Sequence, residues 1–298
     1  MNNWIFCLLL PLFSFAVPNP PHRPSKAPFV SGDGFRAIAD YVFDEVDSSL
    51  NPQSVKPQSS IFVKPDLLDR FFHAVHPLIP HPYVLITHNA DAPMPGPYGH
   101  FADDPKIIAW FGQNYDGYAH PKLHPIPIGI ANYCWPHGRA EWIWSVREFK
   151  YSKKHLVHMN IAIGTFPIER GFVFNHFCSM PSCYHPEAKP FMRFLADVAS
   201  SKFEVAPRGN GLDTHRLWES LYVGTIPIVK TSSLDCLYAG LPVLIIQEWP
   251  EVTEEFLEKK YKEFSEQPFN LEKLFMDYWA KEIDASKKVC EKKYTAPA

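Results

Sequence analysis

Residues 202–230 contain two short apolar runs, KFEVAP and TIPIVK, separated by a glycine-containing turn and a helical pattern. The first run predicts a buried parallel strand, which ends at Pro207 because proline has no N–H to give to a sheet. Asp213 or Thr214 can cap the helix that follows, and Gly224 supplies its C-terminal stop. A strand, a turn, a helix and a second strand in this order predict a parallel α/β sheet.

The turn between this strand and this helix, RGNGLDT, has the composition of an anion site. Gly209 and Gly211 allow a tight turn and a close approach of the backbone. The N-terminus of the helix points its N–H groups and its dipole at the turn, where Arg208 can grip phosphate oxygens. His215 and Glu219 share one helix face, and Glu219 lies one turn in, about the reach of a ribose diol. The turn predicts a nucleotide diphosphate, and the alternative of a plain turn with structural salt bridges stays open.

A second turn of this kind occurs in IAIGTFPIERG, residues 161–171, where a strand ends in a Gly-Thr turn and a cation follows. In a doubly wound sheet both turns open on the same C-terminal edge. We therefore expect Thr165 and Arg170 to face the same pyrophosphate as Arg208. Neither turn is a P-loop, because GNGLDTHR lacks the Gly-Lys-Ser/Thr ending, so hydrolysis of a nucleoside triphosphate is disfavoured.

The same alternation of strands and helices covers most of the chain and divides it into two halves. In the first half, PYVLITHNAD, KIIAWFGQN and HPIPIGIAN each end in polar residues, as strands do where they open on a crevice. Lysines replace apolar residues near residue 150, which predicts an α/β domain over 29–150 and a second over 151–298. The second domain is expected to end in two charged amphipathic helices.

The composition fits two joined α/β cores and excludes a global cationic surface. The chain has 298 residues, of which 46% are hydrophobic, and a formal net charge of −3. A chain of this length usually forms about two domains. A nucleic-acid partner is not expected, because no basic excess attracts a phosphate backbone.

Residues 1–17 contain an apolar run that is too short to span a bilayer comfortably and is interrupted by Pro11. The run fits a signal peptide, although it lacks a basic start, and a short signal anchor or a buried N-terminal element stays open. A leader or anchor predicts a place in the secretory pathway (the lumen of the Golgi or endoplasmic reticulum in a eukaryotic or viral setting) or association with a membrane.

Cysteines and histidines do not form a recognisable metal site in the sequence. No Cys-x-x-Cys pair is present, and the histidines of the first half match no familiar ligand spacing. No metal and no cofactor are therefore predicted. In an oxidising compartment Cys178 and Cys183 can close a small loop, but ordinary buried thiols are the favoured interpretation.

The long string from Arg208 to Val229, continued by SSLDCLYAGLPVLIIQEWPEVT, resembles the exostosin-type glycosyltransferase domain. ITHNADAP, WFGQN, PIPIGIANYCWPHG and IGTFPIERG resemble upstream blocks of exostosin-like bacterial and viral proteins. The resemblance implies an α/β, GT-B-like fold, in which two Rossmann-like domains face a central cleft and the second binds a nucleotide sugar. It also implies that no divalent cation is needed, so activity should survive chelation.

Carried over residue by residue, the resemblance implies that Arg208 and Arg170 bind the diphosphate and that Glu219 binds the ribose. It places four further residues in the same pocket: Asn210, Asp213, Thr214 and His215. An inverting transfer needs a base for the acceptor hydroxyl. Asp91 and His88, just beyond a first-domain strand, are the candidates, and a turn cap is the alternative role for both.

The predicted function is a hexosyl- or pentosyltransferase that moves a sugar from a nucleotide-diphosphate donor to a hydroxyl of a glycan, lipid or protein acceptor. It is expected to be inverting and metal-independent. A non-catalytic protein that binds nucleotide or carbohydrate with the same fold is the alternative. A sugar-phosphate hydrolase that uses His88 and Asp91 is a third hypothesis, which release of phosphate without nucleotide would favour.

Overall fold

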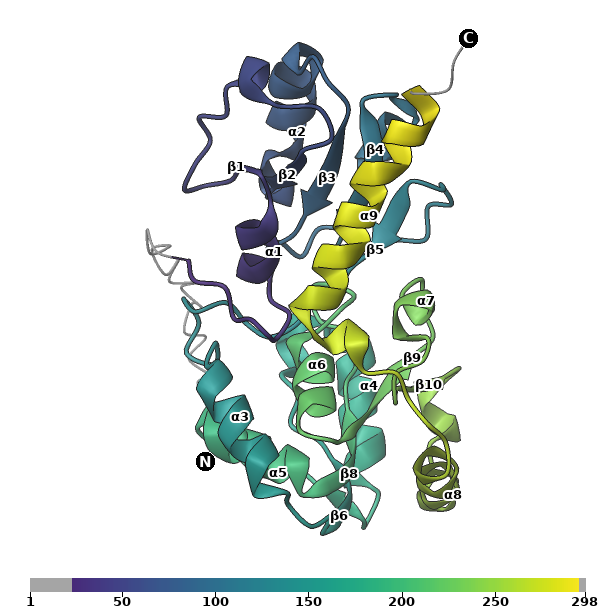
Figure 1. The fold of residues 1–298 in the computed structure, drawn as a ribbon. Coiled ribbons are helices and arrows are strands. Elements are labelled where there is room, and N and C mark those ends of the chain that lie inside the picture. Colours follow the sequence, from purple (N-terminus) through teal and green to yellow (C-terminus); the bar gives the residue numbers. More distant parts are fainter. Residues whose placement is uncertain (1–22, 295–298) are drawn as a thin grey trace, which may run out of the picture.

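The computed structural model describes residues 23–294, with side chains to residue 288, so the leader predicted in residues 1–17 lies outside the described residues. The described residues form two five-stranded sheets, and every strand pairing in both is parallel. We call the parts built on them the first lobe and the second lobe; they are the upper and lower halves of Figure 1.

The first sheet has its strands in chain order, each beside the next. The strands are β1 (Tyr41–Phe43), β2 (Ser60–Val63), β3 (Tyr83–Thr87), β4 (Ile107–Gly112) and β5 (Leu123–Pro125). β2 and β3 are buried along their whole length, as strands covered on both faces must be. The chain order contains no reversal, so this sheet has no topological switch point.

The second sheet has the order β10-β9-β8-β6-β7. Its strands are β6 (His155–His158), β7 (Cys183–Tyr184), β8 (Ser201–Val205), β9 (Ile226–Lys230) and β10 (Leu244–Ile246). The chain leaves β6 to one side for β7 and returns to its other side for β8. A ligand crevice is expected where the strand order reverses, beyond the carboxyl ends of β6 and β8.

Helices cover both sheets and carry the connections. The α-helices are α1 (Gly32–Ile38), α2 (Leu68–Arg70), α3 (Ala140–Phe149), α4 (Pro167–Cys178), α5 (Phe191–Ala199), α6 (His215–Tyr222), α7 (Asp235–Tyr238), α8 (Glu254–Ser265) and α9 (Met276–Tyr294). Short 3-10 turns include η5 (Gly96–Asp103) and η6 (Ile163–Thr165), and a π-helical turn spans Phe71–Val75. In the second lobe, the predicted helix that Asp213 or Thr214 would cap is α6.

The two lobes exchange helices. α3, from the first half of the sequence, packs against α5 and α6 of the second lobe, whereas α9, at the end of the chain, lies along β3 and β4 of the first lobe (Figure 1). The domain boundary near residue 150 stays a prediction. The exchange of helices means that neither lobe is one continuous stretch of the sequence.

One hydrophobic core continues from lobe to lobe. It joins Val84 and Ile86 of β3 to Leu217 and Trp218 of α6, and Trp279 of α9 packs in the same cluster. Each lobe also has a smaller core of its own on the far face of its sheet. The predicted fold class, an α/β, GT-B-like pair of parallel sheets facing a central cleft, is confirmed.

Two further expectations can be compared with the structure. Cys178 and Cys183 are free thiols, so the loop between them is not closed by a disulfide. Within residues 23–294, no helix has the length and apolar character that crossing a membrane requires.

Candidate functional site

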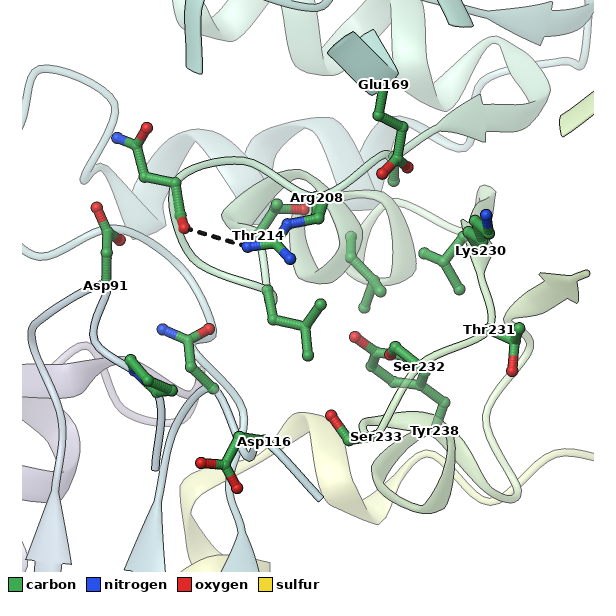
Figure 2. A pocket seen from close by; sticks show the side chains of 17 residues that line it. Asp91, Asp116, Glu169, Arg208, Thr214, Lys230, Thr231, Ser232, Ser233 and Tyr238 are labelled. Carbon is green, nitrogen blue, oxygen red and sulfur yellow. Dashed lines mark hydrogen bonds between the residues drawn. The ribbon is translucent and has the colours of Figure 1, made fainter. Parts of the chain in front are cut away.

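Two hollows flank the loop that follows β8, residues 206–214. The first, which we call the interlobe cleft, has a volume of about 530 Å³ and lies between the carboxyl ends of the two sheets (Figure 2). The second, which we call the aromatic cavity, has a volume of about 800 Å³ and lies beside α5 and α6. Thr214, at the N-cap of α6, lines both hollows.

The interlobe cleft is lined mainly by polar side chains from both lobes. Asp91, Asn114 and Asp116 come from the first lobe, and Glu169, Arg208, Asn210, Lys230 and Ser232 are among those from the second. Figure 2 shows Arg208 extending from the second lobe, with Asp91 and Asp116 on first-lobe segments across from it. Carboxylates, amides and hydroxyls in one hollow suit a ligand with many hydroxyl groups, because each of them can accept from or donate to a hydroxyl.

The aromatic cavity combines rings with charged groups. Its rings are those of His137, Trp142, Phe191, Phe194 and His215, and its charged side chains are those of Arg170, Lys189, Arg216 and Glu219. Burial lowers the pKa of His137 to about 4, and burial likewise lowers the pKa of His215, so both imidazoles are neutral at pH 7. Flat neutral rings beside cations are the surroundings that a nucleobase and a phosphate need.

Glu219 is the most unusual group in this cavity. Its side chain is 4% exposed, and its Oε1 has no hydrogen-bond partner among the described residues. Burial raises the pKa of this carboxyl to about 7, an effect that the nearby Arg216 only partly offsets. A buried carboxylate oxygen without a donor costs free energy, so its presence on a cavity wall indicates a ligand that brings hydroxyl donors.

Arg170 holds the two predicted anion turns together. From α4 it donates Nε to the carbonyl of Arg208 at 2.7 Å, Nη2 to the carbonyl of Pro207 at 3.1 Å and Nη1 to the carbonyl of Ala162 at 3.0 Å. A Cβ on Gly209 would lie 3.2 Å from its Nη2, so glycine allows this approach. Burial, with the nearby Arg216, lowers the pKa of Arg170 to about 10, and the group stays charged at pH 7.

Arg208 is less constrained. Its guanidinium lies 4.3 Å from the centre of the Phe166 ring, and its Nη2 is 3.5 Å from the carbonyl of Asn210. Its Nε is buried without a partner among the described residues. The side chain thus keeps donors available on the wall of the interlobe cleft.

The loop between the two hollows is bonded to the first lobe. Asp213 accepts the backbone N–H of Ile128 at 2.8 Å, and its own N–H donates to Oδ1 of Asn114 at 2.9 Å. A Cβ on Gly211 would lie 2.9 Å from Nδ2 of Asn114, so this glycine serves the contact between the lobes; its φ is not in the left-handed region. His215 adds a third bond, from Nδ1 to the carbonyl of Gly129 at 2.8 Å.

These contacts correct the prediction for Asp213. It was expected to line the pocket, but it lines neither hollow and is 3% exposed. Its carboxylate accepts the backbone N–H groups of Ile128 and Thr214 and the Nε1–H of Trp218, the last at 2.9 Å. Burial raises the pKa of Asp213 to about 6 despite these donors.

The predicted pair of bases is separated by the structure. Asp91 is exposed and lines the interlobe cleft. His88 is 1% exposed, accepts the N–H of Asn89 at Nδ1 and donates Nε2 to the carbonyl of Pro127. Burial lowers the pKa of His88 to about 4, so this imidazole is neutral and both of its nitrogens are occupied. It is not placed to take a proton from a ligand.

The predicted donor residues therefore fall into two groups. Thr165, Arg170, His215 and Glu219 line the aromatic cavity, Arg208 and Asn210 line the interlobe cleft, and Thr214 belongs to both. The sequence reasoning missed Phe191, Phe194 and Arg216. Arg216 stands beside His215 in the stretch already singled out, but nothing in the sequence says that its side chain turns toward the cavity.

Among residues 23–294, no group of three or more His, Cys, Asp or Glu side chains is arranged to hold a metal ion.

Comparison with known proteins gives a distant likeness in fold. The solved structure of an α,α-trehalose 6-phosphate synthase from Burkholderia multivorans matches with a TM-score of 0.45 and 12% identity over 81% of this chain and 74% of that chain. An α,α-trehalose-phosphate synthase (UDP-forming) from Burkholderia vietnamiensis matches with a TM-score of 0.45 and 10% identity, over 82% and 75%. No protein-family model and no curated protein matches the chain. The resemblance to the exostosin family stays a prediction.

Proposed function

We propose that this protein is a glycosyltransferase that takes a sugar from a nucleoside-diphosphate donor. The observation that carries the proposal is Glu219, a buried carboxylate with one unpartnered oxygen on the wall of a cavity that also holds aromatic rings and two arginines. A ribose diol supplies two hydroxyl donors to such a carboxylate. This cavity opens at the strand reversal of the second sheet, where α/β sheets bind their ligands.

In this proposal the donor spans both hollows, with its nucleoside in the aromatic cavity and its sugar in the interlobe cleft. Its base lies among Trp142, Phe191 and Phe194, and its ribose lies on Glu219. The diphosphate then lies near Arg170 and the first turn of α6, where the helix dipole favours an anion. The transferred sugar passes Thr214, the residue common to both hollows, and enters the interlobe cleft beside Arg208.

The acceptor then approaches from the first lobe. Asp91 lies in the cleft with its carboxylate exposed, so it is the candidate base for an acceptor hydroxyl, and the transfer is inverting in this account. The Arg208 guanidinium supplies positive charge where negative charge grows on the leaving diphosphate. The acceptor is a hydroxyl of a glycan, a lipid or a protein, and the reaction needs no bound metal in this proposal.

Two alternatives remain in competition with this proposal. A non-catalytic protein would bind the same nucleotide without turnover. The sugar-phosphate hydrolase hypothesis is weakened, because His88 is buried with both nitrogens engaged. The location in the secretory pathway or at a membrane, predicted from residues 1–17, is retained as part of the proposal.

The test is a panel of nucleotide sugars with the intact chain. We expect at least one nucleoside-diphosphate sugar to raise the melting temperature, and its sugar to be transferred when glycans are offered as acceptors. Binding without transfer or donor hydrolysis across the panel would favour the non-catalytic alternative. A melting temperature that no nucleotide sugar changes would contradict the proposal.

A further inference from the structure

Three charged or polar side chains, two of them fully buried, form a row that ends at the aromatic cavity. Glu204 of β8 is fully buried and accepts from Nη1 of Arg216 at 2.7 Å through one oxygen. Its other oxygen is bonded to Nδ1 of His158, on the neighbouring strand β6, at 2.5 Å. His158 is fully buried as well, and its Nε2 has no partner among the described residues. Glu204 is a charged residue at a fully buried position of a central strand, which is costly unless its partners are fixed.

Arg216 is the member of this row that reaches the cavity. It lines the aromatic cavity, and its side chain is 19% exposed. Its guanidinium also lies 5.1 Å from the centre of the Phe194 ring, which itself packs against His158. One edge of the guanidinium is thus fixed by Glu204 and one face by Phe194, so the remaining donors are presented to the cavity in a set direction.

Arg216 lies close to two other charged groups of the cavity without pairing with either. Its positive charge contributes to the lowered pKa of Arg170 and opposes the raised pKa of Glu219. No ion pair or hydrogen bond joins Arg216 to Glu219 in the part of the chain that the structure describes. Two guanidinium groups facing one hollow, neither paired with a carboxylate of that hollow, are an arrangement that an anion stabilises.

We infer that Arg216 is a further anion-binding residue of the aromatic cavity and that Glu204, held in turn by His158, is its positioning residue. Glu204 binds one edge of the guanidinium and keeps it away from Glu219, so that the remaining N–H donors of Arg216 are available to a diphosphate and the Glu219 carboxylate is available to hydroxyl donors. The inference rests on the proposed function for the identity of the ligand, the diphosphate of a nucleoside diphosphate. A plain structural ion pair would stabilise the fold without discriminating between ligands.

The experiment compares calorimetric affinities for uridine and guanosine diphosphates with those for uridine and guanosine, using the intact chain. Arg216→Ala is expected to weaken binding of the diphosphate roughly ten- to hundredfold, the usual effect of losing a charged hydrogen bond, and to leave nucleoside binding unchanged. Glu204→Gln is expected to weaken diphosphate binding in the same sense. The double variant should bind the diphosphate as weakly as Arg216→Ala alone, because Glu204 affects the affinity only by positioning Arg216.

A matched control is Glu258→Gln. It removes the charge of a surface carboxylate on α8 that pairs with Lys202 of β8, the strand that also carries Glu204. It should bind both ligands as the parent does. Because Glu204 is fully buried, Arg216→Lys provides a variant at the more exposed partner; it keeps the charge but loses the planar fork, and should lie between the parent and Arg216→Ala.

The outcomes separate the inference from the proposed function. If the parent prefers diphosphate and the Arg216 variants bind it as the parent does, the inference is overturned while the function stands. Equal losses for nucleoside and diphosphate in the Arg216 variants indicate a structural role and overturn it too. A parent that binds no nucleoside diphosphate contradicts the proposed function itself.

Discussion

The carboxylate of Asp213 accepts the backbone N–H of Ile128 at 2.8 Å, and so bonds the loop between the two hollows to the first lobe. The same carboxylate accepts Nε1 of Trp218 at 2.9 Å, on the helix that carries Glu219. The position of the loop between the two hollows therefore depends on a buried side chain that lines neither of them.

Asp213→Asn should destabilise the protein by about 2–4 kcal/mol, because the amide nitrogen would face an N–H donor that the carboxylate now satisfies. Chemical denaturation of the parent and the variant measures this difference. Asp91→Asn, at an exposed carboxylate of the interlobe cleft, is the control and should change the free energy of unfolding little. Equal stability of Asp213→Asn and the parent would show that the bond to Ile128 does not hold the lobes together.

Gly211→Ala should cost about 1–3 kcal/mol of stability, because the added Cβ would lie 2.9 Å from the Asn114 side chain. That side chain is also bonded to Asp213 and to the carbonyl of Ala90, so it cannot move without losing these bonds. Gly164→Ala is the matched control, since nothing lies within 4 Å of its added Cβ. Similar melting temperatures for the two alanine variants would contradict the close contact between the lobes.

Glu219→Gln should become more stable than the parent as the pH rises. The carboxyl has a pKa of about 7 in the folded chain against 4.5 when unperturbed, so the folded state loses stability from this group between those values. The glutamine does not titrate, and the difference between variant and parent should grow by up to about 3 kcal/mol between pH 4.5 and pH 8. Denaturation curves at several pH values measure it, with Glu258→Gln as the surface control. A difference that does not change with pH would refute the raised pKa.

Arg208→Ala and Glu219→Ala should have different effects on the reaction. Arg208 lines the interlobe cleft, and in the proposed function it faces the negative charge that grows on the departing diphosphate. Its removal should therefore slow turnover as well as weaken binding, with a loss of about 2–4 kcal/mol of transition-state stabilisation. Glu219 is far from the breaking bond in this account, so its removal should mainly weaken nucleotide affinity. Steady-state kinetics with a saturating donor separate the two effects. An unchanged turnover number in Arg208→Ala would remove Arg208 from the reaction.

The sequence predicts several strands of each lobe. β3 and β4 lie in the apolar runs that predicted them, but the strand expected at the start of IAIGTFPIERG is wrong, because β6 ends at His158 and Ile163–Thr165 form the 3-10 turn η6. The strand and helix of residues 202–222 are where the apolar runs and the caps place them, because a buried strand and an amphipathic helix have strong local patterns. The run HPIPIGIAN is different: only its first two residues belong to β5, and Ile126, Ile128 and Ile130 are buried outside any strand. These isoleucines are buried because the two lobes pack together, and the local sequence pattern does not predict that packing.

The candidate site was predictable in its residues but not in its arrangement. Arg208 and Glu219 are eleven positions apart on one turn and helix, yet they line different hollows. Asp213 has the residue type of a ligand-binding group, but its partner Ile128 is distant in sequence, so its role depends on tertiary contacts. Glu204 could have been noticed as a charged residue between the apolar residues Phe203 and Val205, but its partners could not.

Hydrogen–deuterium exchange of the intact chain, with and without a saturating nucleoside diphosphate, tests the central claim most directly. If the nucleotide binds in the aromatic cavity, backbone amides should exchange more slowly in residues 160–170, 189–194 and 208–219, which line it or carry its charged groups. Slowing confined to the first-lobe loops at residues 88–93 and 113–118, or no slowing in any segment, would contradict the account.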